Sequence, residues 1–470
     1  MTFDSKILFE RLTELAAGEP ASRWLVAFSG GLDSTVLLHA LSCMRERHPA
    51  ATIAIHVDHG LHAESRNWEI HCRQFAGQLG ISYISERVSV DDDLQSGPEA
   101  AARQARYALL QTLVREGDCL LSAHHEEDQA ETLLLNLMRG SGPAGLAGIG
   151  AAQLFGEGRL LRPLLGVSAE AIRDYAKHHD LGWIEDPSNA DTRFDRNFLR
   201  QEIVPRLASR WPGVAASLKQ SADLASEAST LLRDLADIDL AAASGSPERL
   251  DLEVLRALSL QRQRNLLRRA ISLCGLPPPP ATRLYQAVDE LIPARQDAQP
   301  RVAWPGAELR RYRNHLYIMP GVPDLPDEPL QVLRPEASLD LGSGMGQLVL
   351  NPDVDGGINP ELASAGLRVR YRQGGEEIRL AGHDCTHKLK KLLQQEGIVP
   401  WMRSRLPLLY SGGNPARCLI SFSTGSVRCG TSPVRRSAAA KTICAHSPRV
   451  TPRPAPVESS RHRGRALSDA

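Results

Sequence analysis

Residues 24–44 combine an apolar run, a glycine turn and a helical pattern, and this order limits the folds that are open to the chain. Adjacent glycines let the backbone bend sharply and approach a ligand without an intervening Cβ. The helix that follows directs unpaired N–H groups and the positive end of its dipole at the turn, which favours an anion there, most often a phosphate. The turn has the sequence Ser29-Gly30-Gly31-Leu32-Asp33-Ser34.

This turn differs from the Walker-type phosphate loop, because it has neither the Gly-x-x-x-x-Gly-Lys-Ser/Thr spacing nor a lysine. Ser29, Ser34 and backbone amides must therefore hold the anion. The alternative is an ordinary strand-to-helix turn that happens to be rich in glycine and serine.

Apolar runs that predict strands alternate four times with helical patterns in the first part of the chain. Such alternation is typical of a parallel sheet that is covered on both faces and has right-handed crossovers. Ligands of these sheets bind at the carboxyl ends of the strands. The first, second and fourth strands end in the glycine turn, in Asp58-His59 and in His124-His125, so we expect all three in one crevice.

A helix predicted over 126–139 carries Asp128 and Glu131 on one face, because they are three positions apart. Carboxylates beside a phosphate site suggest Mg²⁺, a hard cation that prefers oxygen ligands and phosphate. The alternative is that acidic residues in a first helical turn only complement the helix dipole. The paired His124 and His125 have no third ligand nearby and do not predict a zinc site.

Two informative segments follow this helix. The glycine-rich segment 139–148 predicts either a flexible connection or a loop that closes over a substrate. The segment 193–200 places three arginines among apolar residues, which indicates either a solvated helix face or contact with a phosphate or a tRNA.

Changes in sequence character divide the chain into segments. Residues 1–213 hold the strand and helix alternation, and residues 214–319 are mainly helical, with a basic surface and a terminal hairpin. Prolines recur in residues 320–339, which predicts an extended linker. A small α+β domain is predicted over 340–410. Residues 411–470 show neither a helical nor a strand period and are predicted to be disordered.

Composition narrows the class of protein. No run of roughly 18 apolar residues is present, so no membrane span is expected, and the start lacks the apolar core of a signal peptide. The eight cysteines contain no Cys-x-x-Cys pair, which argues against a zinc ribbon and fits a reduced cytoplasm. The formal net charge is zero, so any nucleic acid must be bound by local basic patches.

The glycine turn resembles the PP-loop of the AMP-forming ATP pyrophosphatases. Further blocks over about residues 20–410 resemble the tRNA(Ile)-lysidine synthetase family. These blocks are His56-Val57-Asp58-His59-Gly60-Leu61, Ala101-Ala102-Arg103 with Arg106-Tyr107, Ala123-His124-His125 through Asp128 to Thr132, Arg139-Gly140-Ser141-Gly142, Ile184-Glu185-Asp186-Pro187-Ser188-Asn189 with Arg196-Asn197, Gly374-Gly375, Lys388-Leu389-Lys390-Lys391 and Pro400-Trp401.

This resemblance implies a parallel-sheet α/β domain, Rossmann-like and of the adenine nucleotide α-hydrolase type, followed by a mainly helical domain and a small α+β C-terminal domain that bind tRNA. It implies ATP-dependent ligation of L-lysine to C2 of the wobble cytidine in a tRNA(Ile) with a CAU anticodon. The expected intermediate is an adenylated cytidine, the by-products are AMP and pyrophosphate, and Mg²⁺ is required. The family is often dimeric, so a homodimer is one expected assembly.

The resemblance also suggests roles for individual residues. The glycine turn, from Ser29 through Gly30, Gly31, Leu32 and Asp33 to Ser34, would hold ATP and the leaving pyrophosphate. Asp33 and Asp128 are the candidate Mg²⁺ ligands, and together with Glu131 they are candidates for orienting the lysine amine. His124, Arg103 and Arg196 are candidates for stabilising the phosphates or the adenylate, because charge that develops at the α-phosphate needs cationic donors.

Three other functions fit parts of this pattern, namely a 2-thiolase of the same superfamily, a small-molecule amidotransferase or synthetase of that superfamily, and a non-catalytic nucleotide-binding protein. The two further domains with basic faces argue against the small-molecule enzyme. The thiolase usually needs a Cys-x-x-Cys pair, and the binding protein does not need the acidic helix. Beyond Tyr410, the strands that complete the last domain of the family are not readable. We therefore expect either a frameshift near 411–416 or a basic extension that is specific to the lineage.

Overall fold

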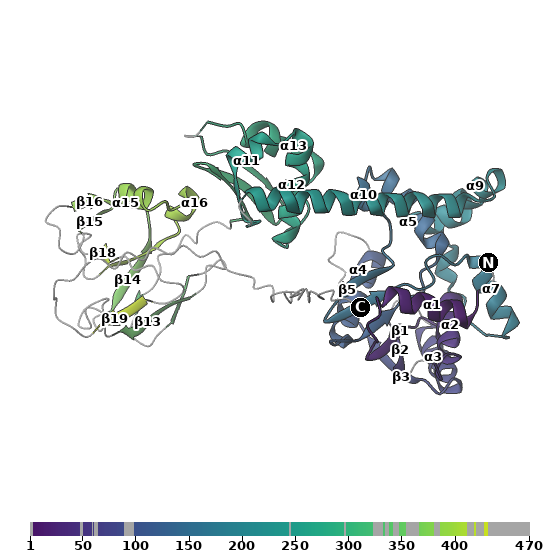
Figure 1. Ribbon diagram of the computed structural model, residues 1–470. Helices are drawn as coiled ribbons and strands as arrows, with labels where there is room; N and C mark the ends of the chain where they lie inside the picture. The colour runs from purple at the N-terminus through teal and green to yellow at the C-terminus, as the bar shows by residue number, and fades with distance from the viewer. Residues whose placement is uncertain are drawn as a thin grey trace, which may run out of the picture. The chain divides into compact units, whose positions relative to one another are not determined.

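The computed structural model describes two compact units, Met1–Leu235 and Ala236–Ala470 (Figure 1). The described residues of the first unit and the start of the second are 3–47, 50–58, 60, 64–88, 98–243, 246–295 and 298–322. Those further along the chain are 332–333, 338–341, 347–353, 366–379, 386–410, 418–419 and 427–430. The division between the units lies within one long helix, α10 (Val214–Ala243), whereas the sequence predicted a boundary at residue 213.

A six-stranded sheet forms the centre of the first unit, in the order β3-β2-β1-β4-β6-β5. All neighbouring strands are parallel except β5 and β6, which form an antiparallel pair at one edge. The parallel α/β fold predicted from the sequence is thereby confirmed. The strands are β1 (Arg23–Ala27), β2 (Ala51–Asp58), β3 (Ser82–Arg87), β4 (Cys119–Leu121), β5 (Ala152–Phe155) and β6 (Gly158–Leu161).

Helices cover both faces of this sheet, because successive residues of each strand point to opposite sides. In β1, Trp24 and Val26 join one buried cluster and Leu25 joins the other. The first cluster packs beneath α1, α2, α3 and α7, and the second beneath α4 (Figure 1). The helices of this part are α1 (Ser5–Leu15), α2 (Leu32–Ser42), α3 (Ser65–Gln78), α4 (Pro98–Leu113), α5 (Glu126–Met138), α6 (Pro143–Leu146) and α7 (Ala169–His178).

The first unit continues into a helical segment with a π-helical turn in its middle. The segment consists of α8 (Asp195–Phe198), the π turn η2 (Leu199–Ile203) and α9 (Val204–Arg210), and it follows a short 3-10 turn, η1 (Pro187–Ala190). The N–H of Val204 donates to the carbonyl of Leu199, five residues back. Pro205 explains the wider turn, because its ring displaces the carbonyl four residues earlier and it has no N–H to donate.

The second unit begins with helices packed on a four-stranded antiparallel sheet in the order β7-β10-β9-β8. Leu266 and Leu267 of the helices and Leu309 and Leu316 of the strands share one core. The hairpin predicted at the end of this region is present, and β7 and β8 extend it. The elements are β7 (Arg249–Asp251), α11 (Leu252–Ala257), α12 (Leu260–Leu273), α13 (Ala281–Gln286), η3 (Ala287–Leu291), β8 (Arg301–Trp304), β9 (Ala307–Tyr312) and β10 (His315–Pro320).

The last part of the second unit is α+β. One sheet has the order β11-β14-β17-β18, another has the order β12-β13-β19, and β15 pairs with β16. Leu389 and Leu393 of α15 pack on Ile378 and Leu408 of the strands. The elements are β11 (Val332–Leu333), β12 (Ser338–Asp340), β13 (Gln347–Asp353), β14 (Leu367–Tyr371), β15 (Glu377–Arg379), β16 (Thr386–Lys388), α15 (Leu389–Gln395), α16 (Pro400–Arg403), β17 (Pro407–Tyr410), β18 (Cys418–Leu419) and β19 (Val427–Gly430).

Two of these strands correct the prediction of disorder for residues 411–470. β18 pairs with β17 through Leu409 and Leu419, and β19 runs parallel to β13. Strands of two and four residues are too short to show a period in the sequence, which is why the pattern missed them. The other residues of that range lie outside the described part of the chain, and so does the predicted linker apart from residues 320–322, β11 and the start of β12. Among the described residues, no helix is long and apolar enough to span a membrane.

Candidate active site

The glycine turn joins the end of β1 to the start of α2, and Gly30 is its corner. Gly30 has φ +83°, and a Cβ there would lie 2.6 Å from Cδ1 of Ile184 and 2.7 Å from Sγ of Cys72. Its carbonyl accepts hydrogen bonds from the N–H of Ile184 at 2.9 Å and from Oγ1 of Thr35 at 3.2 Å. Gly31, in contrast, is the extended N-cap residue of α2, with φ −73°. Only Gly30 therefore requires glycine on backbone grounds.

Serine hydroxyls and helix amides line the inside of this turn. Ser29 Oγ and Ser34 Oγ lie 3.1 Å apart, and Ser34 Oγ donates to the carbonyl of Gly31 at 3.0 Å. Leu32 and Asp33 begin α2, whose first amides have no partner within the helix and point into the turn. The turn therefore has hydroxyl groups and the positive end of a helix dipole on one side, an arrangement that suits an anion.

His125 links this turn to the acidic helix α5. Its Nε2 lies 3.7 Å from Asp33 Oδ2 and 3.6 Å from Asp128 Oδ2, and its Nδ1 lies 3.0 Å from Glu127 Oε2. Burial opposes a charge on the imidazole, but Glu127, Asp128 and Asp33 outweigh it and raise the pKa of His125 to about 9. A cationic His125 thus occupies the space between two carboxylates, one from each helix.

The neighbouring carboxylates have distinct local roles. Asp128 Oδ2 accepts from the N–H of His125 at 3.0 Å and so caps α5, and Glu127 accepts from the N–H of Ala169 at the start of α7. Burial raises the pKa of the Asp33 carboxyl above its ordinary value, against the opposing charge of His125. Asp128 therefore complements the helix terminus, as the simpler alternative predicted, and also faces Asp33 across His125.

Glu131 lies one turn further along α5 and meets two arginines. Its carboxylate accepts from Nε and Nη2 of Arg200 at 2.6 and 3.1 Å, and Arg196 Nε lies 3.7 Å away. Arg196 also donates to Oγ1 of Thr132 at 2.9 Å. Arg200 was absent from the predicted site residues. The signal available for it was its position four residues after Arg196, on the same side of a helical segment.

His124 and two arginines form the other side of the site. Burial lowers the pKa of His124 to about 3, and the positive charges of Arg162, Arg103 and Arg196 act in the same direction, against Asp128. His124 is therefore neutral, with Nδ1 2.6 Å from Ser122 Oγ. Arg103 stacks on the ring of Tyr107 at 5.0 Å. The buried Arg162, which the sequence did not predict as a site residue, donates to the carbonyl of Gly150 at 2.5 Å.

Side chains from α5 hold the glycine-rich segment after that helix. Gln129 donates to the carbonyls of Ala147 and Ile149 and accepts from the N–H of Ile149 at 2.6 Å. Asn136 donates to the carbonyl of Gly145 at 2.8 Å. The segment contains α6, and these bonds hold it to α5 at Gly145, Ala147 and Ile149.

The end of β2 lies on the far side of the turn. Asp58 accepts from the N–H of Gly60 at 2.8 Å, and Arg87 Nε lies 3.7 Å from its carboxylate. Its neighbour His59 lies outside the described residues.

The donor set suits a hard cation that arrives with a phosphate ligand. Asp33 and Asp128 both direct a carboxylate oxygen toward Nε2 of His125, at 3.7 and 3.6 Å, beside the anion-binding turn. Within the described residues, no group of three or more His, Cys, Asp and Glu side chains is arranged to hold a metal ion. Mg²⁺ typically uses one or two carboxylates together with substrate phosphates and water, so two carboxylates at this place fit it.

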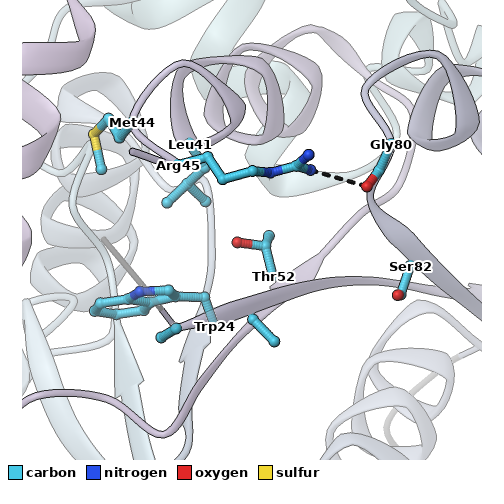
Figure 2. Close-up of a pocket in the computed structure, with 9 residues that line it drawn as sticks. Trp24, Leu41, Met44, Arg45, Thr52, Gly80 and Ser82 are labelled. Atoms are coloured by element: carbon cyan, nitrogen blue, oxygen red, sulfur yellow. Dashed lines mark hydrogen bonds between the residues drawn. The ribbon is translucent and has the colours of Figure 1, made fainter. Parts of the chain in front are cut away.

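A cavity of about 280 Å³ lies at the other end of the strands, where β1, β2 and β3 begin (Figure 2). Trp24, Thr52 and Ser82 line it together with the end of α2. Its one cation, Arg45, donates to the carbonyls of Leu79 and Gly80 at 3.1 and 2.9 Å. Because the turn and α5 lie at the carboxyl ends of the strands, this cavity is separate from the candidate site.

Family models match three stretches of the chain. They are a PP-loop domain over residues 5–207, a TilS substrate binding domain over 250–317 and a TilS substrate C-terminal domain over 367–417. The first match contains the turn and α5. The third continues past residue 410, where the sequence predicted the domain to end.

Whole-chain relatives agree with these models. A tRNA(Ile)-lysidine synthase of Alkalilimnicola ehrlichii is 45% identical over 409 residues, which cover 85% of this chain and 89% of the relative. The enzymes of the same name from Coxiella burnetii and Methylococcus capsulatus are 40% and 43% identical, over 87% and 84% of this chain and 90% and 91% of the relatives. The similarity therefore extends over most of this chain and most of each relative.

Proposed function

This chain belongs to the tRNA(Ile)-lysidine synthase family, and from that premise we propose that it joins L-lysine to the wobble cytidine of a tRNA(Ile) with a CAU anticodon. ATP first adenylates the cytidine at its C2 oxygen and releases pyrophosphate, and the ε-amine of lysine then displaces AMP. The observation that carries the proposal is the similarity over most of the chain, combined with an anion-binding turn next to an acidic helix.

In this proposal the turn holds the pyrophosphate that leaves. The hydroxyls of Ser29 and Ser34 and the first amides of α2 donate to phosphate oxygens, and the sharp corner at Gly30 brings the backbone close. Such fixed donors stabilise charge where it develops in the transition state, since they need no reorganisation during the reaction.

Asp33 and Asp128 are the proposed ligands of Mg²⁺. The ion would neutralise phosphate charge and make pyrophosphate a better leaving group. In the ligand-free protein the cationic His125 balances the two carboxylates, which lowers the cost of holding like charges together. Glu131 is the proposed partner of the lysine amine, because it is a buried carboxylate next to this pair.

His124, Arg103 and Arg196 are the proposed partners of the α-phosphate and the adenylate. The pKa of His124 keeps its ring neutral, so it acts as a hydrogen-bonding group and leaves positive charge to the arginines. The second unit would bind the tRNA, which agrees with the family description of residues 250–317 as a substrate binding domain. A homodimer and a cytoplasmic location are further parts of this proposal.

The 2-thiolase and the non-catalytic binding protein are not favoured, because the relatives that cover most of the chain are lysidine synthases. One assay separates the three possibilities. The full chain is incubated with ATP, Mg²⁺, labelled lysine and a CAU-anticodon tRNA transcript, and label in the RNA is compared with AMP formed.

We expect one AMP per lysine incorporated, and no incorporation into a matched transcript in which uridine replaces the wobble cytidine. Asp128→Asn should lower the rate by on the order of 10²-fold, because a positioned charge is lost. Asp174→Asn, an exposed residue on α7, serves as the control. ATP binding without any lysine in the RNA would contradict the proposal and favour the binding protein.

A further inference from the structure

Arg200 bridges the two carboxylates of α5 with one guanidinium group. Its Nε donates to Glu131 Oε1 at 2.6 Å, and its Nη2 donates to Glu131 Oε2 at 3.1 Å and to Asp128 Oδ1 at 3.0 Å. A planar fork of donors suits two carboxylate groups at once, whereas a lysine ammonium is a point charge. The bridge therefore depends on arginine and not only on positive charge.

Burial makes this bridge important for Glu131. The Glu131 side chain is 1% exposed, and that of Arg200 is 41% exposed, so Arg200 covers the carboxylate from the solvent side. Arg196 lies farther from Glu131, at 3.7 Å, and its Nη2 is bonded to Thr132. A buried carboxylate that loses its hydrogen-bonding partner changes either its orientation or its charge. Arg200 opposes both: its two hydrogen bonds fix the orientation of the carboxylate, and its charge counteracts the burial that raises the pKa of Glu131.

Arg200 also completes the fixation of Asp128. Asp128 Oδ2 is held by the backbone N–H of His125, and Asp128 Oδ1 is held by Arg200. Each oxygen thus has its own donor, one from the start of α5 and one from the π turn. The carboxylate plane of Asp128 is set by both contacts together.

The backbone places Arg200 in this position. Arg200 belongs to the π turn η2, which Pro205 imposes on the segment from α8 to α9. Arg196 and Arg200 are four residues apart, and both reach carboxylates or hydroxyls of α5. The contact is therefore part of how two helical segments pack and not a chance meeting of long surface side chains.

We propose that Arg200 is a positioning residue for the lysine-joining reaction: it holds Glu131 and Asp128 in one fixed arrangement next to the anion-binding turn. This inference rests on the function proposed above. Arg200 makes no bond to the reacting atoms and acts through the two carboxylates.

The test compares three variants of the full chain in the lysine incorporation assay. Arg200→Gln should lower kcat by about 10²-fold and change the KM for ATP by less than about threefold, since misplacing reacting groups by about 1 Å costs that much rate. Arg200→Lys keeps the positive charge but lacks the planar pair of N–H donors, and it should have about a tenth of the wild-type rate. Arg206→Gln, which removes an exposed pair with Glu202, should leave both constants unchanged.

A double-mutant cycle, measured under single-turnover conditions, asks whether Arg200 acts through Glu131. In the Glu131→Gln background, Arg200→Gln should lower the rate by about tenfold instead of about 10²-fold, because one of the two carboxylates that it positions is already gone and only Asp128 remains. If the rate of the double variant falls by the product of the two single losses, the inference is overturned, since Arg200 then acts independently of Glu131.

Binding and stability measurements complete the test. Arg200→Gln should still bind ATP and unfold cooperatively, so joint loss of binding and of the unfolding transition would assign Arg200 to the scaffold and overturn the inference. If Arg200→Gln fails to fold, Arg200→Lys carries the comparison. A wild-type chain that transfers no lysine overturns the proposed function and this inference with it, whereas an active wild type with multiplying losses overturns this inference alone.

Discussion

Replacement of Gly30 by alanine tests the geometry of the anion-binding turn, and Gly31→Ala is its matched control. Gly30 has φ +83°, a region that costs a residue with a Cβ about 1–2 kcal/mol. The new Cβ would also lie 2.6 Å from Ile184 Cδ1 and 2.7 Å from Cys72 Sγ. Displacing such neighbours in a packed region costs about 1–3 kcal/mol.

The two terms together predict that Gly30→Ala lowers the free energy of unfolding by about 2–5 kcal/mol. This decrease is offset by about 0.4–1 kcal/mol, because alanine restricts the unfolded chain. At Gly31, φ is −73° and the nearest atom to a Cβ is Ser29 Oγ at 3.6 Å, which is an ordinary contact. Gly31→Ala should therefore change stability by less than about 1 kcal/mol.

Denaturant unfolding followed by tryptophan fluorescence measures the difference, because Trp24 is buried in β1, the strand that leads into the turn. ATP binding, measured by equilibrium dialysis, should be lost or weakened in Gly30→Ala as the turn opens. Equal midpoints and equal ATP affinity for the two variants would refute the reasoning, since they would mean that neither the backbone angle nor the close contacts constrain the turn.

Three further predictions concern other parts of the first unit. The pKa of His125 is about 9, against an ordinary value near 6.5, so its protonated form stabilises the folded state by on the order of 3 kcal/mol. This contribution is fully present below about pH 6.5 and is lost as the pH rises through about 9. In metal-free buffer the denaturation midpoint should therefore fall over that pH range in the wild type but not in His125→Gln. Midpoints that fall in parallel in the two proteins would refute this prediction. Asp118→Asn should lower the free energy of unfolding in urea by about 1–3 kcal/mol, because the buried carboxylate accepts hydrogen bonds from Arg23 Nε and from the N–H of Arg115, each at 2.9 Å. A decrease no larger than that of the exposed control Asp223→Asn would argue against this prediction. Gln129→Ala should speed amide exchange at Ala147 and Ile149, which the side chain anchors, whereas exposed Gln111→Ala should not, and equal exchange in both would show that the segment holds itself in place.

Much of the site was predictable because its parts lie at strand ends. The apolar runs that predict strands and the helical spacing in 126–139 placed the turn, His124-His125 and Asp128 at the carboxyl ends of the strands of a parallel sheet. Local backbone chemistry then determined the details, such as the positive φ of Gly30. These features depend on near neighbours in the sequence, so pattern reasoning reaches them.

Arg200 and the anchored glycine-rich segment were not predictable in the same way. Arg200 reaches Glu131 across 69 positions of sequence, and the contact depends on a π turn that Pro205 imposes. Gln129 reaches Ile149 across 20 positions. Nothing in either local pattern states what the side chain will meet after packing. The strands β18 and β19 were missed for a different reason, since two and four residues are too few to show alternation.

The central claim is that the full 470-residue chain converts the wobble cytidine into its lysine adduct. The direct measurement is mass spectrometry of nucleosides after complete digestion of a CAU-anticodon tRNA(Ile) transcript that was incubated with the chain, ATP, Mg²⁺ and lysine. The account predicts a nucleoside with the mass of cytidine plus lysine minus one water, absent when ATP is omitted or when uridine replaces the wobble cytidine. Recovery of unmodified cytidine only, from a chain that still binds ATP, would contradict it.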